Sequence, residues 1–189
     1  MQGLAQTILA AKAAISVGWL ALFLGAERLW PSDAPPAGRP WARLGRNGAL
    51  WLLNAGLAAV FTVPLTAFAA AHAPWERPDG WAGVGGLLFD ILLLEFWIYW
   101  WHRWNHEVPF LWRFHAVHHL DRFLDASSAV RFHFGEVALS AAARALVVYA
   151  LAVPIASVLL FEALLLIATV FHHSNLKLPQ GFERALSRL

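Results

Sequence analysis

Long apolar runs separated by short polar stretches make up most of the sequence. The first three runs are Gln6–Leu24, Gly48–Ala71 and Val84–Trp101. A helix rises about 1.5 Å per residue, so runs of this length approach or exceed the roughly 30 Å thickness of a hydrocarbon core. Pro64 lies in the second run, and membrane helices tolerate proline where neighbouring groups satisfy the freed carbonyl. The pattern predicts membrane-crossing helices.

Two further runs, Val137–Val153 and Ile155–Phe171, meet at Pro154, and each is near the short limit for a span. They predict either two full crossings or a hairpin that enters the membrane and returns. The predicted fold class is all-α: an integral membrane helical bundle of about four to five apolar helices. We divide the chain into N-terminal membrane helices with a basic loop, 1–84, and a histidine-rich membrane domain, 85–189.

The composition agrees with a membrane protein. Of the 189 residues, 59% are hydrophobic and only 14% are charged, which is too apolar for an ordinary soluble domain. The absence of cysteine excludes thiolate zinc sites, iron–sulfur clusters and disulfides. The formal net charge is +2 and the arginines are scattered, so no nucleic acid partner is expected.

The positions of the arginines predict the orientation in the membrane. The stretch Arg28–Asn47 is rich in proline and glycine and is expected to be a loop. Its basic residues are Arg28, Arg39, Arg43 and Arg46. The histidine-rich region carries Arg103, Arg113, Arg122 and Arg131. Cytoplasmic loops are enriched in such residues, and two crossings separate the two regions, so both are predicted on the cytoplasmic side.

Five histidines follow the third apolar run at helical spacings. His102 and His106 form H-x-x-x-H, and His115, His118 and His119 form H-x-x-H-H. Side chains three or four positions apart share a helix face, and neighbours lie about 100° apart. His118 and His119 could therefore face two neighbouring metal ions while His115 shares a face with both. Imidazole suits iron, zinc and copper, so the spacing predicts a two-metal site without choosing the metal.

Three other residues belong to this hypothesis. Glu95 precedes His102 by seven positions and shares its helical face. It is predicted to hydrogen-bond a ligating imidazole, with direct ligation or a helix–helix hydrogen bond as alternatives. His172 and His173 end the last apolar run, and the predicted topology returns them to the side of the other histidines.

Other metal chemistries are less consistent with the sequence. A zinc protease would need H-E-x-x-H, and soluble di-iron bundles use Glu-x-x-His pairs; neither motif occurs. A transmembrane haem protein would place lone histidines on separate facing helices, whereas these histidines cluster together. A non-catalytic membrane metal-binding protein remains an alternative.

The motifs taken together resemble the fatty acid hydroxylase and sterol desaturase superfamily. The resemblance spans about residues 85–183 and includes R-x-H-x-x-E (Arg131, His133, Glu136) and F-H-H-S-N-L-x-L-P. It implies a membrane oxygenase with a histidine-ligated di-iron centre on the cytoplasmic side. Such enzymes use O2 and an external donor of ferredoxin or cytochrome type to hydroxylate or desaturate a membrane lipid or sterol. Acyl-CoA desaturases are less similar, because their first two histidine clusters lie further apart.

The resemblance also implies a set of site residues. The matching metal ligands are His102, His106, His115, His118, His119 and His172, with His133 and His173 as two further recurrent histidines. They would hold two iron ions, with zinc as a substitute. Glu95 and Glu136 are the candidate hydrogen-bond partners of the ligands.

The sequence departs from the family pattern at two points. Phe134 stands where the R-x-H-P element has proline, which is expected to alter a local turn. Family members also carry another H-x-x-H-H cluster after H-H-S-N, and the sequence ends at Leu189 before one occurs. The resemblance therefore predicts a fragment, a shortened relative or a site completed by another chain.

Overall fold

The computed structural model describes residues 2–35 and 40–188, and the regular elements in this part of the chain are helices. The α-helices are α1 (Gln2–Leu29), α2 (Pro40–Leu57), α3 (Val63–Ala71), α4 (Gly83–Glu107), α5 (Pro109–His119), α6 (Phe134–Ala150), α7 (Ile155–His173) and α8 (Gln180–Leu186). Shorter elements are the π-helix η1 (Ala58–Thr62) and the 3₁₀ helices η2 (Asp79–Trp81) and η3 (Ala126–Val130). The predicted all-α class is confirmed.

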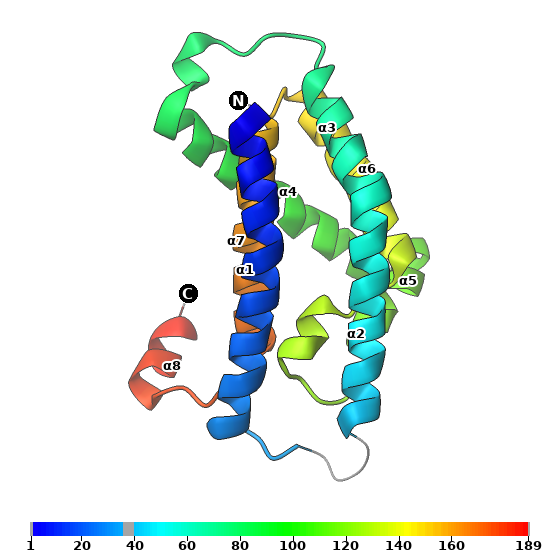
Figure 1. Cartoon of the computed structure of the whole chain (residues 1–189), viewed down its shortest axis with the longest axis vertical. Coiled ribbons are helices and arrows are strands. Elements are labelled where there is room, and N and C mark those ends of the chain that lie inside the picture. Colours follow the sequence, from blue (N-terminus) through cyan, green and yellow to red (C-terminus); the bar gives the residue numbers. More distant parts are fainter. Residues whose placement is uncertain (1, 36–39, 189) are drawn as a thin grey trace.

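The helices pack in pairs whose members are far apart in the sequence. In Figure 1, α1 lies beside α7, and α3 lies beside α6. One buried cluster contains Ala69 of α3 with Leu94 and Phe161 of α4 and α7. Another joins Phe23 of α1 to Val170 of α7. Both cores therefore cross the division proposed at residue 84, which stays a prediction.

Among the described residues, three helical segments are long and apolar enough to cross a membrane: 41–71, 83–107 and 155–173. The first combines α2, η1 and α3 into one continuous rod. Pro64 lacks an N–H group, and just before it the Val63 N–H bonds to Ala58, five residues back, which forms the π turn. The last two predicted runs are separate helices, α6 and α7, with α6 only 17 residues long.

The loop predicted over Arg28–Asn47 is wrong at both ends. The first helix continues to Leu29, and α2 already begins at Pro40. Proline suits the first turn of a helix, where its missing N–H is not needed, so the proline-rich composition marks a helix start as well as a turn. Arg43 and Asn47 consequently lie on α2. Arg39 lies outside the described residues.

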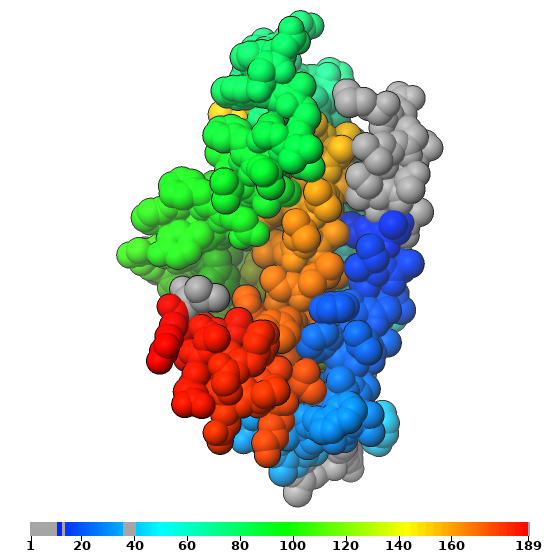
Figure 2. All heavy atoms as spheres, turned by 90° about the vertical axis from the view of Figure 1, so that its left-hand side faces the viewer, coloured from blue at the N-terminus to red at the C-terminus, as the bar shows by residue number. Residues whose placement is uncertain are grey.

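Several ionic side chains inside the bundle are paired. Asp90 is 1% exposed, accepts a hydrogen bond from Ser157 Oγ at 2.7 Å and pairs with Arg77 at 2.6 Å. Glu162 of α7 pairs with Lys12 of α1 and with Arg144 of α6. Charges at membrane depth are costly unless paired, so these contacts set which helices can be neighbours. Figure 2 shows α7 running between α1 and α4, with α8 against its lower part.

Candidate metal centre

The turn between α4 and α5 brings the first two histidine motifs together. His102 and His106 lie in the last turns of α4, which ends at Glu107. Val108 is extended, with φ −92° and ψ 114°, as expected for a residue that precedes proline. Pro109 then begins α5, which folds back so that its histidines face those of α4.

Four histidines form one convergent group, defined by His102, His106, His115 and His119. The His106 Nε2 atom lies 3.2 Å from His102 Nε2 and 3.3 Å from His115 Nε2. The His119 Nε2 atom lies 3.1 Å from His115 Nε2. His115 is fully buried, and the other three histidines are exposed. The predicted approach of the first two motifs is therefore present in the structure.

A second group consists of His118 and His173. Their Nε2 atoms lie 3.0 Å apart, although the residues come from α5 and from the end of α7. The ring centroids of His115 and His118 are 5.6 Å apart, so the two groups adjoin. This arrangement has two neighbouring points of convergence.

Hydrogen bonds on the opposite ring nitrogens fix three of these imidazoles. His115 Nδ1 lies 2.7 Å from Glu136 Oε1, His118 Nδ1 lies 3.2 Å from the Arg131 carbonyl, and His173 Nδ1 lies 2.8 Å from the Thr169 carbonyl. Carbonyl and carboxylate oxygens can only accept, so each Nδ1 carries the proton and each neutral Nε2 carries a lone pair.

This protonation pattern fits a bound metal. Two unprotonated Nε2 atoms, such as those of His118 and His173, cannot hydrogen-bond each other, and a cation between them removes the repulsion. Ligand nitrogens about 2.0–2.1 Å from a metal lie about 2.8–3.4 Å apart at coordination angles of about 90–110°. The observed Nε2 separations of 3.0–3.3 Å fall in this range. Ligand atoms of His102, His106 and His115 also all lie within 4.8 Å of one another.

The electrostatic environment on α5 favours neutral rings. Burial, followed by the neighbouring His173, lowers the pKa of His118 to about 3. Partial burial and the neighbouring His115 lower the pKa of His119. Both residues are therefore unprotonated near pH 7, the form that ligates a metal.

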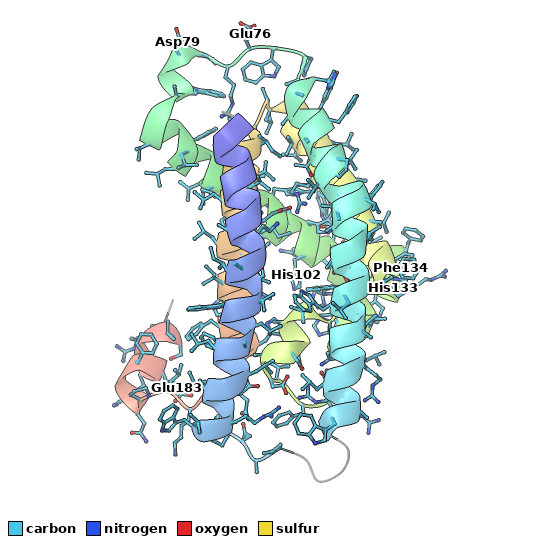
Figure 3. All side chains as sticks on the ribbon, in the orientation of Figure 1. Glu76, Asp79, His102, His133, Phe134 and Glu183 are labelled. Carbon is cyan, nitrogen blue, oxygen red and sulfur yellow. The ribbon has the colours of Figure 1, made fainter. Side chains whose placement is uncertain are left out.

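The structure places three predicted site residues elsewhere. His172 is exposed, and its neighbour His173 occupies the place next to His118. His133 is the N-cap of α6, where its Nδ1 atom accepts a hydrogen bond from the Gly135 N–H at 3.0 Å. In Figure 3 it lies with Phe134, apart from His102. Glu95 is exposed on α4. Roles for these three residues stay predictions that this arrangement does not support.

The loop that follows α5 packs against the ends of α1 and α2 that their connection joins. Arg43 of α2 donates to Asp121 Oδ2 at 2.9 Å and also pairs with Asp125, in the loop after α5. Glu27 of α1 accepts from the Ala126 N–H, at 3.0 Å. The two arginine-rich regions thus contact each other, while their predicted cytoplasmic orientation stays a prediction.

Sequence reasoning missed two residues that contact the histidine-bearing segments. Asn47 and Asn54 of α2 hydrogen-bond Arg131 and Phe132, which adjoin His118. Asn54 is a polar residue within an apolar run, which is a signal for a buried hydrogen bond. Asn47 carried no such signal, because it was placed in a loop.

The fold and the site define a helical membrane protein with a histidine cluster of metal-binding geometry. The sequence profile of the fatty acid hydroxylase family matches residues 87–188, which is more than half of the chain. The chain belongs to the fatty acid hydroxylase family.

A curated relative is the ornithine lipid hydroxylase OlsE of Rhizobium tropici. The two proteins are 31% identical over 123 residues, covering 65% of this chain and 37% of that protein. The match thus spans little more than a third of the relative's length. No solved structure matches the chain.

Proposed function

We propose that this chain forms the metal centre of an O2-dependent hydroxylase that acts on a membrane lipid, with two iron ions as the cofactor. Membership of the fatty acid hydroxylase family and the similarity to a lipid hydroxylase support this class of reaction. The structural observation that carries the proposal is the pair of adjoining histidine groups whose Nε2 atoms converge. The four-histidine group would hold one ion, and His118 with His173 would contribute to the second.

The proposed reaction consumes one O2 molecule and two electrons per turnover. One oxygen atom is inserted into a C–H bond of the lipid, and the other leaves as water after taking up two protons. The carbon is oxidised, and an external electron donor of ferredoxin or cytochrome type is oxidised with it. Iron, when bound, would supply the redox chemistry of oxygen activation.

The residues of the chain orient the ligands for this chemistry. Glu136 holds the proton of His115 on Nδ1, and the carbonyls of Arg131 and Thr169 do the same for His118 and His173. The ring of Trp112 lies 5.6 Å from those of His106 and His119, measured between centroids, and packs beside them. We also propose that the centre faces the cytoplasm, where a soluble donor can reach it.

The test compares the detergent-purified chain loaded with iron or with zinc. Both metals suit imidazole, but zinc has no redox chemistry. We expect the iron-loaded chain, given a reduced donor and 18O2, to add one labelled oxygen atom to a lipid, with ornithine lipids and phospholipids as first substrates. A product that loses two hydrogens without gaining oxygen would assign desaturation instead. Metal binding without O2-dependent product from the iron-loaded chain would indicate a non-catalytic metal-binding protein.

A pair of histidine substitutions tests the site itself. His118→Ala should abolish product formation and reduce the bound metal, because it removes one of the two Nε2 atoms of the second group. The matched control is His72→Ala, since His72 is exposed and caps the end of α3. Equal activity of the two variants would contradict the assignment of His118.

A further inference from the structure

We propose that α2 carries two positioning residues for the metal centre, Asn47 and Asn54, which act through the segment Arg131–Phe132 on His118. The inference rests on the proposed metal centre. It means that α2, which lies before the residues matched by the family profile, 87–188, helps to position the histidines of that centre. It predicts that the two points of convergence depend on different parts of the chain.

Asn47 holds the side chain of Arg131. It is 0% exposed, and its Oδ1 accepts a hydrogen bond from Arg131 Nη1 at 3.0 Å. Its Nδ2 donates to Asp121 Oδ2 and to Ser127 Oγ, both at 2.9 Å. The amide group therefore uses both its donor and its acceptor sides, which a hydrophobic side chain of similar size cannot reproduce.

Asn54 holds the main chain of the next residue. It lies seven positions after Asn47, which is two helical turns further along the same face of α2. Its Nδ2 donates to the Phe132 carbonyl at 2.9 Å. Two polar contacts from one helix face therefore fix consecutive residues, Arg131 by its side chain and Phe132 by its backbone.

The fixed segment contacts His118 in the ring plane and on the ring face. The Arg131 carbonyl accepts the His118 Nδ1 proton at 3.2 Å, and Arg131 Nε donates to the carbonyl of Val117 at 2.8 Å. The Phe132 ring stacks on the His118 ring with centroids 4.7 Å apart and planes 3° apart. These contacts set both the tautomer and the direction in which Nε2 points, toward His173.

Among the described contacts, the four-histidine group has no hydrogen bond to α2 or to the segment Arg131–Phe132. His102, His106, His115 and His119 lie on α4 and α5, and the Nδ1 partner of His115 is Glu136 of α6. Loosening the segment Arg131–Phe132 should therefore weaken metal binding at His118 and His173 and leave the other group unchanged.

The experiment measures each histidine separately in the full chain labelled with 15N-histidine in detergent. In the metal-free protein, the ring nitrogen shifts report the tautomer, and we expect the Nδ1–H form for His118 in the wild type. In Asn47→Ala and Asn54→Ala, we expect a mixture that includes the Nε2–H form. Zinc titration followed by the same signals should show about a 10- to 100-fold weaker affinity at His118 and His173, the usual effect of losing such support, with His106 and His115 unaffected.

The control variant is Ser157→Ala, which loses a 2.7 Å hydrogen bond to Asp90 in another part of the bundle. It should lower thermal stability without changing the His118 tautomer or either zinc affinity. Asn54→Ala removes a single hydrogen bond and keeps the test decisive where Asn47→Ala fails to fold.

The outcomes separate this inference from the proposed function. Retention of the Nδ1–H form of His118 and of wild-type zinc affinity in the folded variants overturns the positioning role while leaving the metal centre intact. Equal weakening of both histidine groups also overturns it, because it indicates a general structural effect. A wild type that binds no zinc or iron refutes the proposed function, and the tautomer measurement still decides whether α2 positions His118.

Discussion

Substitution of Glu136 tests whether its carboxylate supports metal binding. Glu136 Oε1 lies 2.7 Å from His115 Nδ1, with Glu136 7% exposed and His115 fully buried. A hydrogen bond to a charged group contributes roughly 1.5–3 kcal/mol, and each 1.4 kcal/mol corresponds to about a tenfold change in an equilibrium constant. If this bond strengthens His115 as a ligand, its loss should weaken metal binding about 10- to 100-fold.

Two substitutions of Glu136 should give losses of metal affinity at the two ends of this 10- to 100-fold range. Glu136→Gln keeps a carbonyl oxygen near His115 but removes the charge, so the affinity should fall toward the lower limit, about tenfold. Its new amide N–H group would occupy the position of Oε2, which is buried without a partner, so some loss of thermal stability should accompany it. Glu136→Ala leaves the His115 Nδ1–H unpaired in a buried site and should approach a hundredfold loss.

Zinc affinity, measured by competition with a chromophoric chelator at pH 7.5, reads out the effect. The matched control is Glu107→Gln, which makes the same chemical change at an exposed residue that pairs with Arg103. We expect wild-type affinity from this control. Unchanged affinity in both folded Glu136 variants would refute the idea that the carboxylate supports His115.

Further predictions concern the fold and the bound metal. Glu27→Ala removes the acceptor of the Ala126 and Asn175 N–H groups, both at 3.0 Å; leaving buried donors unpaired costs about 1–3 kcal/mol each, so the midpoint of thermal unfolding, followed by circular dichroism, should fall. Gly86→Ala should also destabilise the chain by about 1–3 kcal/mol, because a Cβ atom at Gly86 would lie 1.6 Å from the Trp81 carbonyl oxygen; a wild-type midpoint would contradict this contact. Removing metal with a chelator should lower the unfolding midpoint of the wild type, since a ligand bound only to the folded state stabilises it, and should change it much less in His115→Ala.

The helices were predictable because each apolar run is bounded by polar or proline-containing residues. Histidines three and four positions apart were also placed correctly on common faces, since this follows from local helix geometry. Glu95 shows the limit of the same reasoning. It shares a face with His102, but seven residues correspond to about 10 Å along the axis and Glu95 is exposed, so a shared face does not by itself predict contact.

The choice between His172 and His173 depends on tertiary structure. These neighbours point about 100° apart, and only the rotation of α7 against its partners decides which faces His118. That rotation is fixed by contacts with residues far away in the sequence, such as Lys12 with Glu162 and Glu27 with Asn175. The contacts of Asn47 and Asn54 could not be predicted for a related reason, since they follow from where α2 begins and how it packs.

The pairing of α1 with α7 has a consequence for how the protein assembles. Lys12 and its partner Glu162 are 150 residues apart in the sequence, so α1 is synthesised well before α7, the helix it packs against. Until α7 is inserted, Lys12 is unpaired in the membrane domain, and His118 has no His173 opposite it. Such long-range contacts form late, and completion of the helix pair and of the second histidine group would then be a single event in the biogenesis of this protein.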